Sequence, residues 1–266
     1  MFDSQPASRP FAPLDYALYA ITVLAWGLSW IAMHYQVGQV APEVSVVWRF
    51  AIACPLMLIF AAARGERLVF RLAEHRYFAG LGAAIFSINF ALFYYAAQHV
   101  ASGLLSIVFS LASIGNVALG SLIFGTRIER QVVLGGASGV LGVAAMFAPQ
   151  LGGMRVDSAV LAGLGLSFAG TVSFCIGNML SVAAQRRRLP VFATIGWGMG
   201  YGAAFMALFS LSRGAAFTME WSASYLGGLL YLSGALVMSY NIWMTIAGRV
   251  RSERPLVTPV QLQPAE

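Results

Sequence analysis

The sequence predicts an all-α fold, a polytopic bundle of transmembrane helices. Hydrophobic residues make up 59% of the chain and charged residues only 10%, and the mean hydropathy is +0.76, a balance unlike that of a water-soluble domain. The apolar residues gather in runs of roughly 20, the length at which a helix crosses a hydrocarbon core about 30 Å thick. These runs are apolar on every face, whereas the strands of a membrane β-barrel alternate apolar and polar residues.

About eight runs are long enough to cross a membrane. They cover approximately residues 15–33, 44–62, 77–98, 102–125, 131–148, 158–184, 191–212 and 224–247. Pro55 lies inside the second run, where we expect it to kink the helix without ending it. An even number of spans would place the two ends of the chain on the same side of the membrane.

The arginines predict which side that is. All sixteen basic residues are arginines, and most lie in the tails and loops of one side. These are Arg9, Arg64, Arg67, Arg71, Arg76, Arg127, Arg130, Arg186, Arg187, Arg188, Arg249, Arg251 and Arg254. The opposite side has only Arg155 and Arg213. Because cytoplasmic loops carry the excess of arginine, we expect both tails in the cytoplasm and the helices in a bacterial inner membrane. Short basic loops of this kind do not indicate a nucleic-acid partner.

Arg49 is the one charged residue that lies clearly within a predicted span, next to Trp48 and near the start of the second run. Three interpretations are open. Its guanidinium could reach the membrane interface, it could organise hydrogen bonds between helices, or it could contact an anionic group of a substrate.

Other polar and aromatic side chains within the runs predict a substrate pathway, because unpaired polar groups are costly in a membrane. Ser106, Ser110, Ser113 and Asn116 are spaced by four, three and three residues, which predicts one polar stripe along a helix. Hydroxyls, amides and aromatic rings suit a neutral or zwitterionic organic solute better than a bare ion. The candidate pathway residues are Trp26, Ser29, Trp30, Asn89, Tyr94, Ser106, Ser110, Ser113, Asn116, Thr171, Asn178, Trp197 and Tyr201.

Acidic residues, by contrast, fall at the ends of spans or in loops, as Glu43, Glu66 and Glu74 do. We therefore expect no proton relay through carboxylates within the membrane. Cys54 and Cys175 sit in apolar runs without the spacing of a metal site, so no metal, cofactor or catalytic residue is expected.

Glycines predict where helices pack closely, since lipid provides no hydrophobic force between them. Two sets have the small-xxx-small spacing. They are Gly196, Gly198, Gly200 and Gly202 in the seventh run, and Gly135, Gly139 and Gly142 in the fifth. Both sets are interpreted as packing seams.

Four segments together resemble the EamA-like drug/metabolite transporters. They are LAWGLSW (24–30), VVWRF (46–50), ALFYYAAQHVASGLLSIVFSLASI (91–114) and GTRIERQVVLGGASGVLGV (125–143). The resemblance extends over about residues 15–232, and within the family the chain looks closest to YddG-type amino-acid exporters. It implies ten helices in two inverted repeats of five, with the substrate pathway between the repeats.

The chain departs from that pattern after the fifth span. We expect a cytoplasmic tail at 1–14, a first five-helix repeat at 15–148, an incomplete second repeat of three helices at 149–247, and a cytoplasmic tail at 248–266. The last helix, GGLLYLSGALVMSYNIWMTIAGR (227–249), resembles the final helix of a cbb3-class oxidase subunit. A chain with only three histidines cannot supply the haem and copper ligands of such an enzyme.

The expected function is therefore that of a permease, an exporter of small organic metabolites, with amino acids, aromatic or otherwise neutral, as substrates. It would work by alternating access with the lipid bilayer and a small-molecule substrate as partners. The alternative is a truncated, fused or engineered membrane protein that does not transport.

Overall fold

The protein is described from a computed structural model, over residues 40–125, 128, 130–152 and 158–234 and the single residues 16, 20, 23, 24, 27, 28, 32 and 36. Within this part of the chain every regular element is helical, which confirms the all-α prediction. The helices are α2 (Pro42–Ala63), α3 (Leu72–Ala83), the π-helical segment η1 (Ala84–Asn89), α4 (Phe90–Ala96), α5 (Ser102–Ser110), α6 (Ala112–Phe124), α7 (Arg130–Gly152), α8 (Ser158–Arg186), α9 (Val191–Ser212) and α10 (Ala223–Leu232).

Five segments of the described chain are long and apolar enough to cross a membrane. They are Pro42–Ala63, Leu72–Ala96, Ser102–Phe124, Ser158–Arg186 and Val191–Ser212. Each matches a predicted span to within a few residues, except that the second begins five residues before the expected position 77. The predicted span at 131–148 coincides with α7. Most of 15–33 and the end of 224–247 lie outside the described residues, so a total of eight spans stays a prediction.

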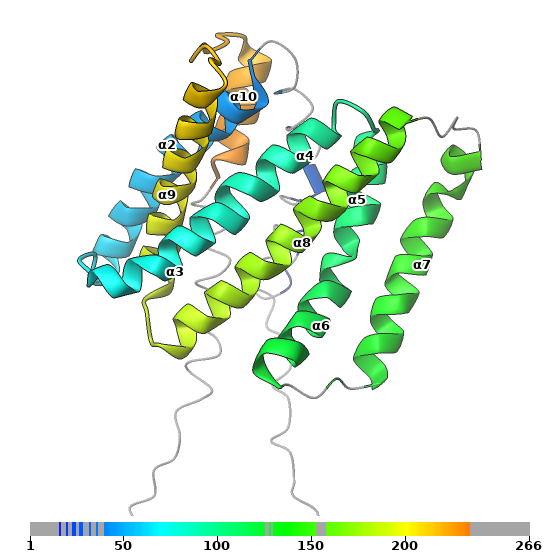
Figure 1. The fold of residues 1–266 in the computed structure, drawn as a ribbon, viewed down its shortest axis with the longest axis horizontal. Helices are drawn as coiled ribbons and strands as arrows, with labels where there is room; N and C mark the ends of the chain where they lie inside the picture. The colour runs from blue at the N-terminus through cyan, green and yellow to red at the C-terminus, as the bar shows by residue number, and fades with distance from the viewer. Residues whose placement is uncertain are drawn as a thin grey trace, which may run out of the picture.

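The helices form two groups joined by a diagonal pair (Figure 1). α2, α9 and α10 lie side by side in one group, and α5, α6 and α7 form the other. Between them run α8 and the long helix made of α3, η1 and α4, and α8 contacts both η1 and α6. The apolar core extends from α2 and α9 through η1 and α4 to the start of α5.

The glycine seam predicted in α9 is confirmed. A Cβ atom added at Gly202 would lie 2.5 Å from the Cβ of Phe86, and one added at Gly82 would lie 2.8 Å from the carbonyl oxygen of Gly198. Because no side chain intervenes, α9 approaches η1 and α3 at backbone distance. The prediction for α7 is wrong in the described part of the chain, since a Cβ at Gly135, Gly139 or Gly142 would meet nothing within 4 Å.

Two local irregularities were not foreseen from the sequence. The predicted helix at 102–125 is divided at Leu111 into α5 and α6. The predicted helix at 77–98 widens into the π-helical turn η1, where Ser173 of α8 donates a hydrogen bond of 2.7 Å to the carbonyl of Ala84. A π turn shifts the backbone register and leaves a carbonyl in need of a donor, which the neighbouring helix provides. Pro55, by contrast, lies inside a continuous α2, as expected.

Candidate functional site

A set of polar side chains, buried except for one half-buried arginine, lies where α2, α4 and α10 meet. We call it the central polar cluster and define it as Gln36, Ser45, Arg49, Tyr94 and Tyr225. Tyr94 is fully buried and donates a hydrogen bond to Oε1 of Gln36, itself only 1% exposed. Ser45 and Tyr225, also buried, share a hydrogen bond of 3.0 Å between their hydroxyls. The cluster thus has members on three of the described helices and in the segment that precedes α2.

The guanidinium of Arg49 belongs to this cluster. Seven residues separate Arg49 from the start of α2, or about 10 Å along the helix axis at 1.5 Å per residue. Its Cζ atom lies 4.1 Å from the centroid of the Phe90 ring, and the guanidinium interacts with the hydroxyl of Tyr94. The Nε atom is buried, while the residue as a whole is half-buried. Of the three interpretations, the hydrogen-bond hub and the anion contact are compatible with this geometry.

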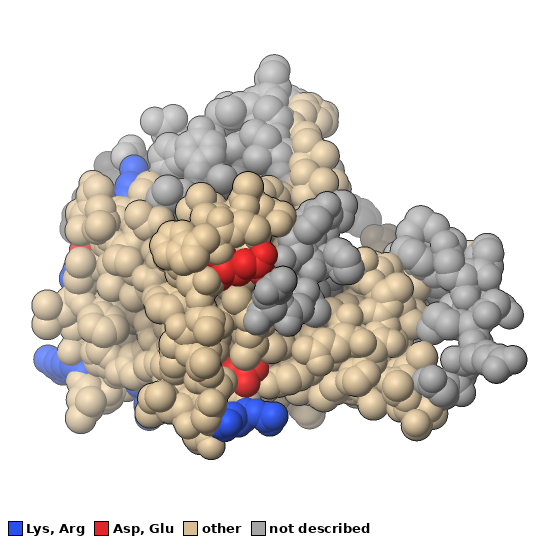
Figure 2. All heavy atoms as spheres, turned by 90° about the horizontal axis from the view of Figure 1, so that it is seen from above, with Lys and Arg blue, Asp and Glu red and all other residues tan. Residues whose placement is uncertain are grey.

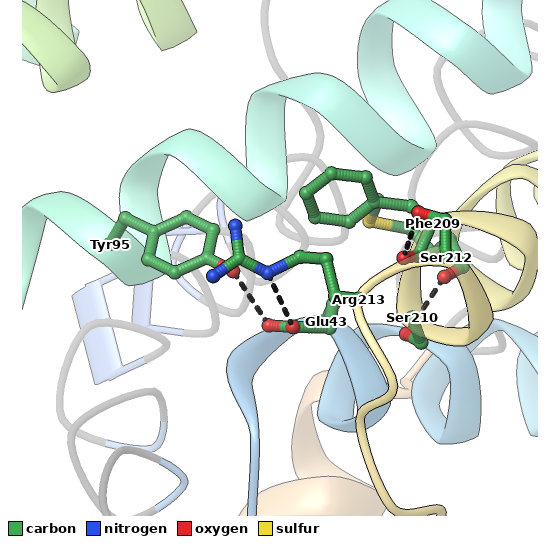
Figure 3. Close-up of polar contacts among 7 residues, drawn as sticks. Glu43, Tyr95, Phe209, Ser210, Ser212 and Arg213 are labelled. Carbon is green, nitrogen blue, oxygen red and sulfur yellow. Dashed lines mark hydrogen bonds and ion pairs between the residues drawn. The ribbon is translucent and has the colours of Figure 1, made fainter.

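One end of the bundle is held by the acidic side chain of Glu43, as Figure 3 shows. Tyr95 of α4 donates a hydrogen bond of 2.8 Å to Glu43 Oε2, and Arg213 at the end of α9 approaches Oε1 to 3.7 Å. We call Glu43, Tyr95 and Arg213 the Glu43 latch. Glu43 lies at the end of its helix, as predicted, but it is only 4% exposed. Nearby, Trp48 donates a hydrogen bond to the carbonyl of Thr218, which ties the α9–α10 connection to α2.

The opposite end carries an aromatic and basic cluster. Trp197 donates a hydrogen bond of 3.0 Å to the carbonyl of Leu68, and the Tyr201 hydroxyl lies 3.0 Å from Nδ1 of His75. His75 lies in the first turn of α3, because that helix begins at Leu72. Arg76 donates a hydrogen bond to the hydroxyl of Tyr77, and Arg187 lies over the ring of Tyr77.

The basic segment before α3 and the basic segment after α8 therefore meet at this one end, which we call the arginine-rich end. The view in Figure 2 shows a surface that is largely uncharged, with acidic and basic side chains in a few isolated places.

The predicted pathway residues fall into separate places and not into one. Tyr94 belongs to the central polar cluster, and Trp197 and Tyr201 lie at the arginine-rich end. Asn116 of α6 and Asn178 of α8 form a hydrogen bond of 3.1 Å, and Thr171 is buried on α8 with its hydroxyl bonded to the carbonyl of Ser167. Asn89 is buried at the end of η1. Trp26, Ser29 and Trp30 lie outside the described residues.

The serine stripe is less continuous than its spacing suggests. Ser106 and Ser110 of α5 donate to the carbonyls of Gly103 and Ile107, three residues earlier in the same helix. The break at Leu111 follows, and Ser113 is exposed on α6. Two of these hydroxyls are thus satisfied by their own helix.

Sequence reasoning missed Gln36, Ser45 and Tyr225 in the cluster, and Arg213 in the latch. Ser45 had a detectable signal, since it lies four residues before Arg49 and shares its face of α2. The sequence has no comparable signal for Gln36 or Tyr225, because each lies far along the chain from its partner.

The sequence profile of the EamA-like transporter family matches residues 15–148, half of the chain. The chain belongs to this family. It is a multi-pass membrane transporter, and the family points to transport and not to enzymatic chemistry. Its partners accordingly include a small-molecule substrate and membrane lipid.

Two individual relatives match over most of this transporter, and a third matches over less than half of it. The probable amino-acid metabolite efflux pump of Salmonella typhimurium is 24% identical over 257 residues, which cover 93% of this chain and 82% of that protein. The uncharacterized transporter YoaV of Bacillus subtilis is 21% identical over 87% of this chain and 78% of YoaV. Protein PagO of Salmonella typhimurium is 30% identical over 107 residues, 40% of this chain and 35% of PagO.

A solved crystal structure shares the fold of this transporter. The two superpose with a TM-score of 0.65 over 88% of this chain and 80% of the other, at 19% sequence identity. A likeness at this identity concerns the fold alone.

Proposed function

We propose that this transporter exports small organic metabolites, with neutral amino acids, aromatic ones included, as its substrates, by alternating access around the central polar cluster. The observation that carries the proposal is the position of that cluster. It lies buried between helices, with the Glu43 latch at one end of the bundle and the Trp197 and Tyr201 contacts at the other. A site that is closed at both ends needs one set of contacts to open at a time, which is the geometry of alternating access.

Two further points support this substrate class. A relative that aligns with 93% of the chain is named as a probable amino-acid metabolite efflux pump. The cluster also combines hydroxyls, an amide and a guanidinium with the Phe50, Phe86 and Phe90 rings, which pack edge to face. Such a mixture fits a solute with both polar and apolar parts.

The positions of the charged residues indicate how the transporter is oriented in the membrane and what drives transport. We place the arginine-rich end in the cytoplasm, with both tails on that side, and the Glu43 latch towards the outside. Glu43 lies in the first turn of α2, bound to Tyr95 and Arg213, so it is not positioned as the middle of a proton relay. Movement driven by the substrate's own gradient is the resulting mechanism.

The test is counterflow in proteoliposomes that contain the purified full chain. We expect labelled phenylalanine, leucine and threonine to exchange against the same unlabelled amino acid, at rates that saturate with concentration. Protein-free vesicles are the control. A correctly folded protein that gives no flux above this control would contradict the proposal and favour a chain that does not transport. Uphill accumulation on an imposed proton gradient would contradict the uncoupled mechanism.

A further inference from the structure

Two hydrogen-bond donors in the central polar cluster have no partner within the described part of the chain. They are Nε2 of Gln36 and Nε of Arg49, both buried. A buried donor without a partner costs roughly 1–3 kcal/mol, and more when the group is charged. Protein interiors therefore rarely keep two such donors together unless something else accepts their hydrogen bonds.

These two donors are neighbours through a single hydroxyl. Tyr94 donates to Oε1 of Gln36 and interacts with the guanidinium of Arg49. A guanidinium can only donate, and the Tyr94 proton goes to Gln36, so a hydrogen bond between Arg49 and Tyr94 would run from the guanidinium to the phenol oxygen. The unpaired N–H groups thus belong to two side chains that have Tyr94 as a common neighbour.

The charge of Arg49 points to the chemistry of that acceptor. Among the described residues the ion pairs are Arg67 with Glu74 and Arg213 with Glu43, so Arg49 has no carboxylate of its own. Glu43 precedes Arg49 on α2, but its two oxygens already bind Tyr95 and Arg213. A cation within a membrane protein is costly unless it is paired, and a carboxylate from a ligand would pair it.

The surroundings of Arg49 point to the rest of the ligand. Its Cζ atom lies 4.1 Å from the centroid of Phe90 and 5.2 Å from that of Phe50. A ligand that places its carboxylate at Arg49 would have these rings beside it. This favours an apolar or aromatic body over a second charge.

We propose that Arg49 and Gln36, aligned by Tyr94, form the anchor for the carboxylate of the exported solute. The proposal rests on the proposed export function and narrows it to monocarboxylates, amino acids among them. One carboxylate oxygen accepts from Arg49 and the other from the amide of Gln36. Solutes of the same shape that lack the carboxylate are excluded, because they leave both donors unpaired.

The test measures binding to the purified full chain in detergent, separately from transport. The probes are L-phenylalanine, L-phenylalaninamide and phenethylamine, which share the ring and differ in the carboxylate. We expect L-phenylalanine to bind about 10- to 100-fold more tightly than the other two, the range typical of a charged hydrogen bond lost. Equal binding of the acid and the amide would overturn the proposal, and so would a wild-type protein that binds none of the probes at millimolar concentration.

Two variants locate the anchor. Arg49→Gln should lower the affinity for L-phenylalanine by a similar 10- to 100-fold and abolish the preference for the acid. Gln36→Glu supplies an internal carboxylate to Arg49, so it should abolish binding while raising the midpoint of thermal unfolding. The second variant keeps the test valid if Arg49→Gln does not fold. Wild-type affinity in either variant would overturn the proposal.

The matched control is Thr194→Val, because Thr194 on α9 has the remaining buried hydroxyl without a partner in the described chain, outside the cluster. It should bind L-phenylalanine as the wild type does, and a loss equal to that of Arg49→Gln would overturn the assignment to Arg49. Transport without any preference for carboxylates would refute the anchor and leave the export function standing. Selective binding of L-phenylalanine without counterflow would support the anchor and contradict the export function.

Discussion

Single side chains in this transporter are informative mainly through their partners. Glu43 and Arg49 lie two turns apart on α2, yet one is held by a phenol and an exposed arginine while the other has no acidic partner among the described residues. Ser45 lies between them and pairs with a tyrosine 180 residues away. The first two turns of one helix therefore contribute both to the latch and to the cluster.

The pair of Ser45 and Tyr225 gives a prediction at this scale. Tyr225→Phe leaves the buried hydroxyl of Ser45 without its partner, and Ser45→Ala does the same to Tyr225. Each should lower the free energy of unfolding by about 1–2 kcal/mol. The double variant should cost less than the sum, since removing both groups leaves nothing unpaired. Unfolding in mixed micelles measures all four proteins, and strict additivity would show that the two hydroxyls do not interact.

Glycines, which have no side chain, determine how closely whole helices approach one another in this transporter. α9 contacts η1 and α3 at backbone distance because glycines occupy the contact positions, and α8 adds hydrogen bonds from Ser173 to the opened turn of η1. α7 has a similar glycine spacing, but a Cβ atom added at Gly135, Gly139 or Gly142 would meet nothing within 4 Å. Spacing alone thus identifies a surface that could pack closely, and the arrangement of helices determines whether it does.

The difference in packing between α9 and α7 can be tested by replacing one glycine with alanine on each helix. Gly202→Ala would bring a Cβ to 2.5 Å from Phe86 Cβ and 2.8 Å from its carbonyl oxygen, so α9 must move. We expect a loss of about 1–3 kcal/mol in the free energy of unfolding. Gly135→Ala on α7 is the matched control, with open space around the new atom. It should be neutral or stabilise by up to about 1 kcal/mol, since alanine favours helix. Equal effects of the two changes would refute the seam.

At the scale of the whole molecule, charge separates the two ends of the bundle. Arg76 and Arg187 meet around Tyr77 at the arginine-rich end, whereas Arg213 binds Glu43 at the other. The apolar middle that separates them has to be surrounded by lipid. The orientation we propose follows from the preference of arginine-rich loops for the cytoplasm.

Cysteine labelling in intact cells tests this orientation. In a chain with Cys54→Ala and Cys175→Ser, Gln185→Cys places a thiol at the exposed end of α8, near Arg186. Ala216→Cys places one in the exposed α9–α10 connection. We expect a membrane-impermeant maleimide to label position 216 in spheroplasts and position 185 only after the membrane is permeabilised. The inverse pattern would show that the bundle is inserted the other way round.

Composition and run length predicted the all-α membrane fold and the position of most described helices. They could do so because the absence of water in a bilayer forces each backbone amide to bond within its own helix. This constraint depends only on residues that are close together in the sequence. Ser45 and Tyr94 were within reach of such reasoning, since each lies on a predicted span. The break at Leu111, the π turn at 84–89 and the division of the polar residues among several places were not, because they depend on neighbouring helices.

The sequence by itself therefore determined that this protein spans a membrane as helices, and it predicts that the positive charge gathers on one side. Only the tertiary structure decided that Gln36, Arg49 and Tyr94 share one buried place and that Glu43 is held by Tyr95 and Arg213. The physical reason is distance along the chain. Helix formation and insertion act on adjacent residues, whereas hydrogen bonds between residues 58 or 180 positions apart exist only once the helices have packed.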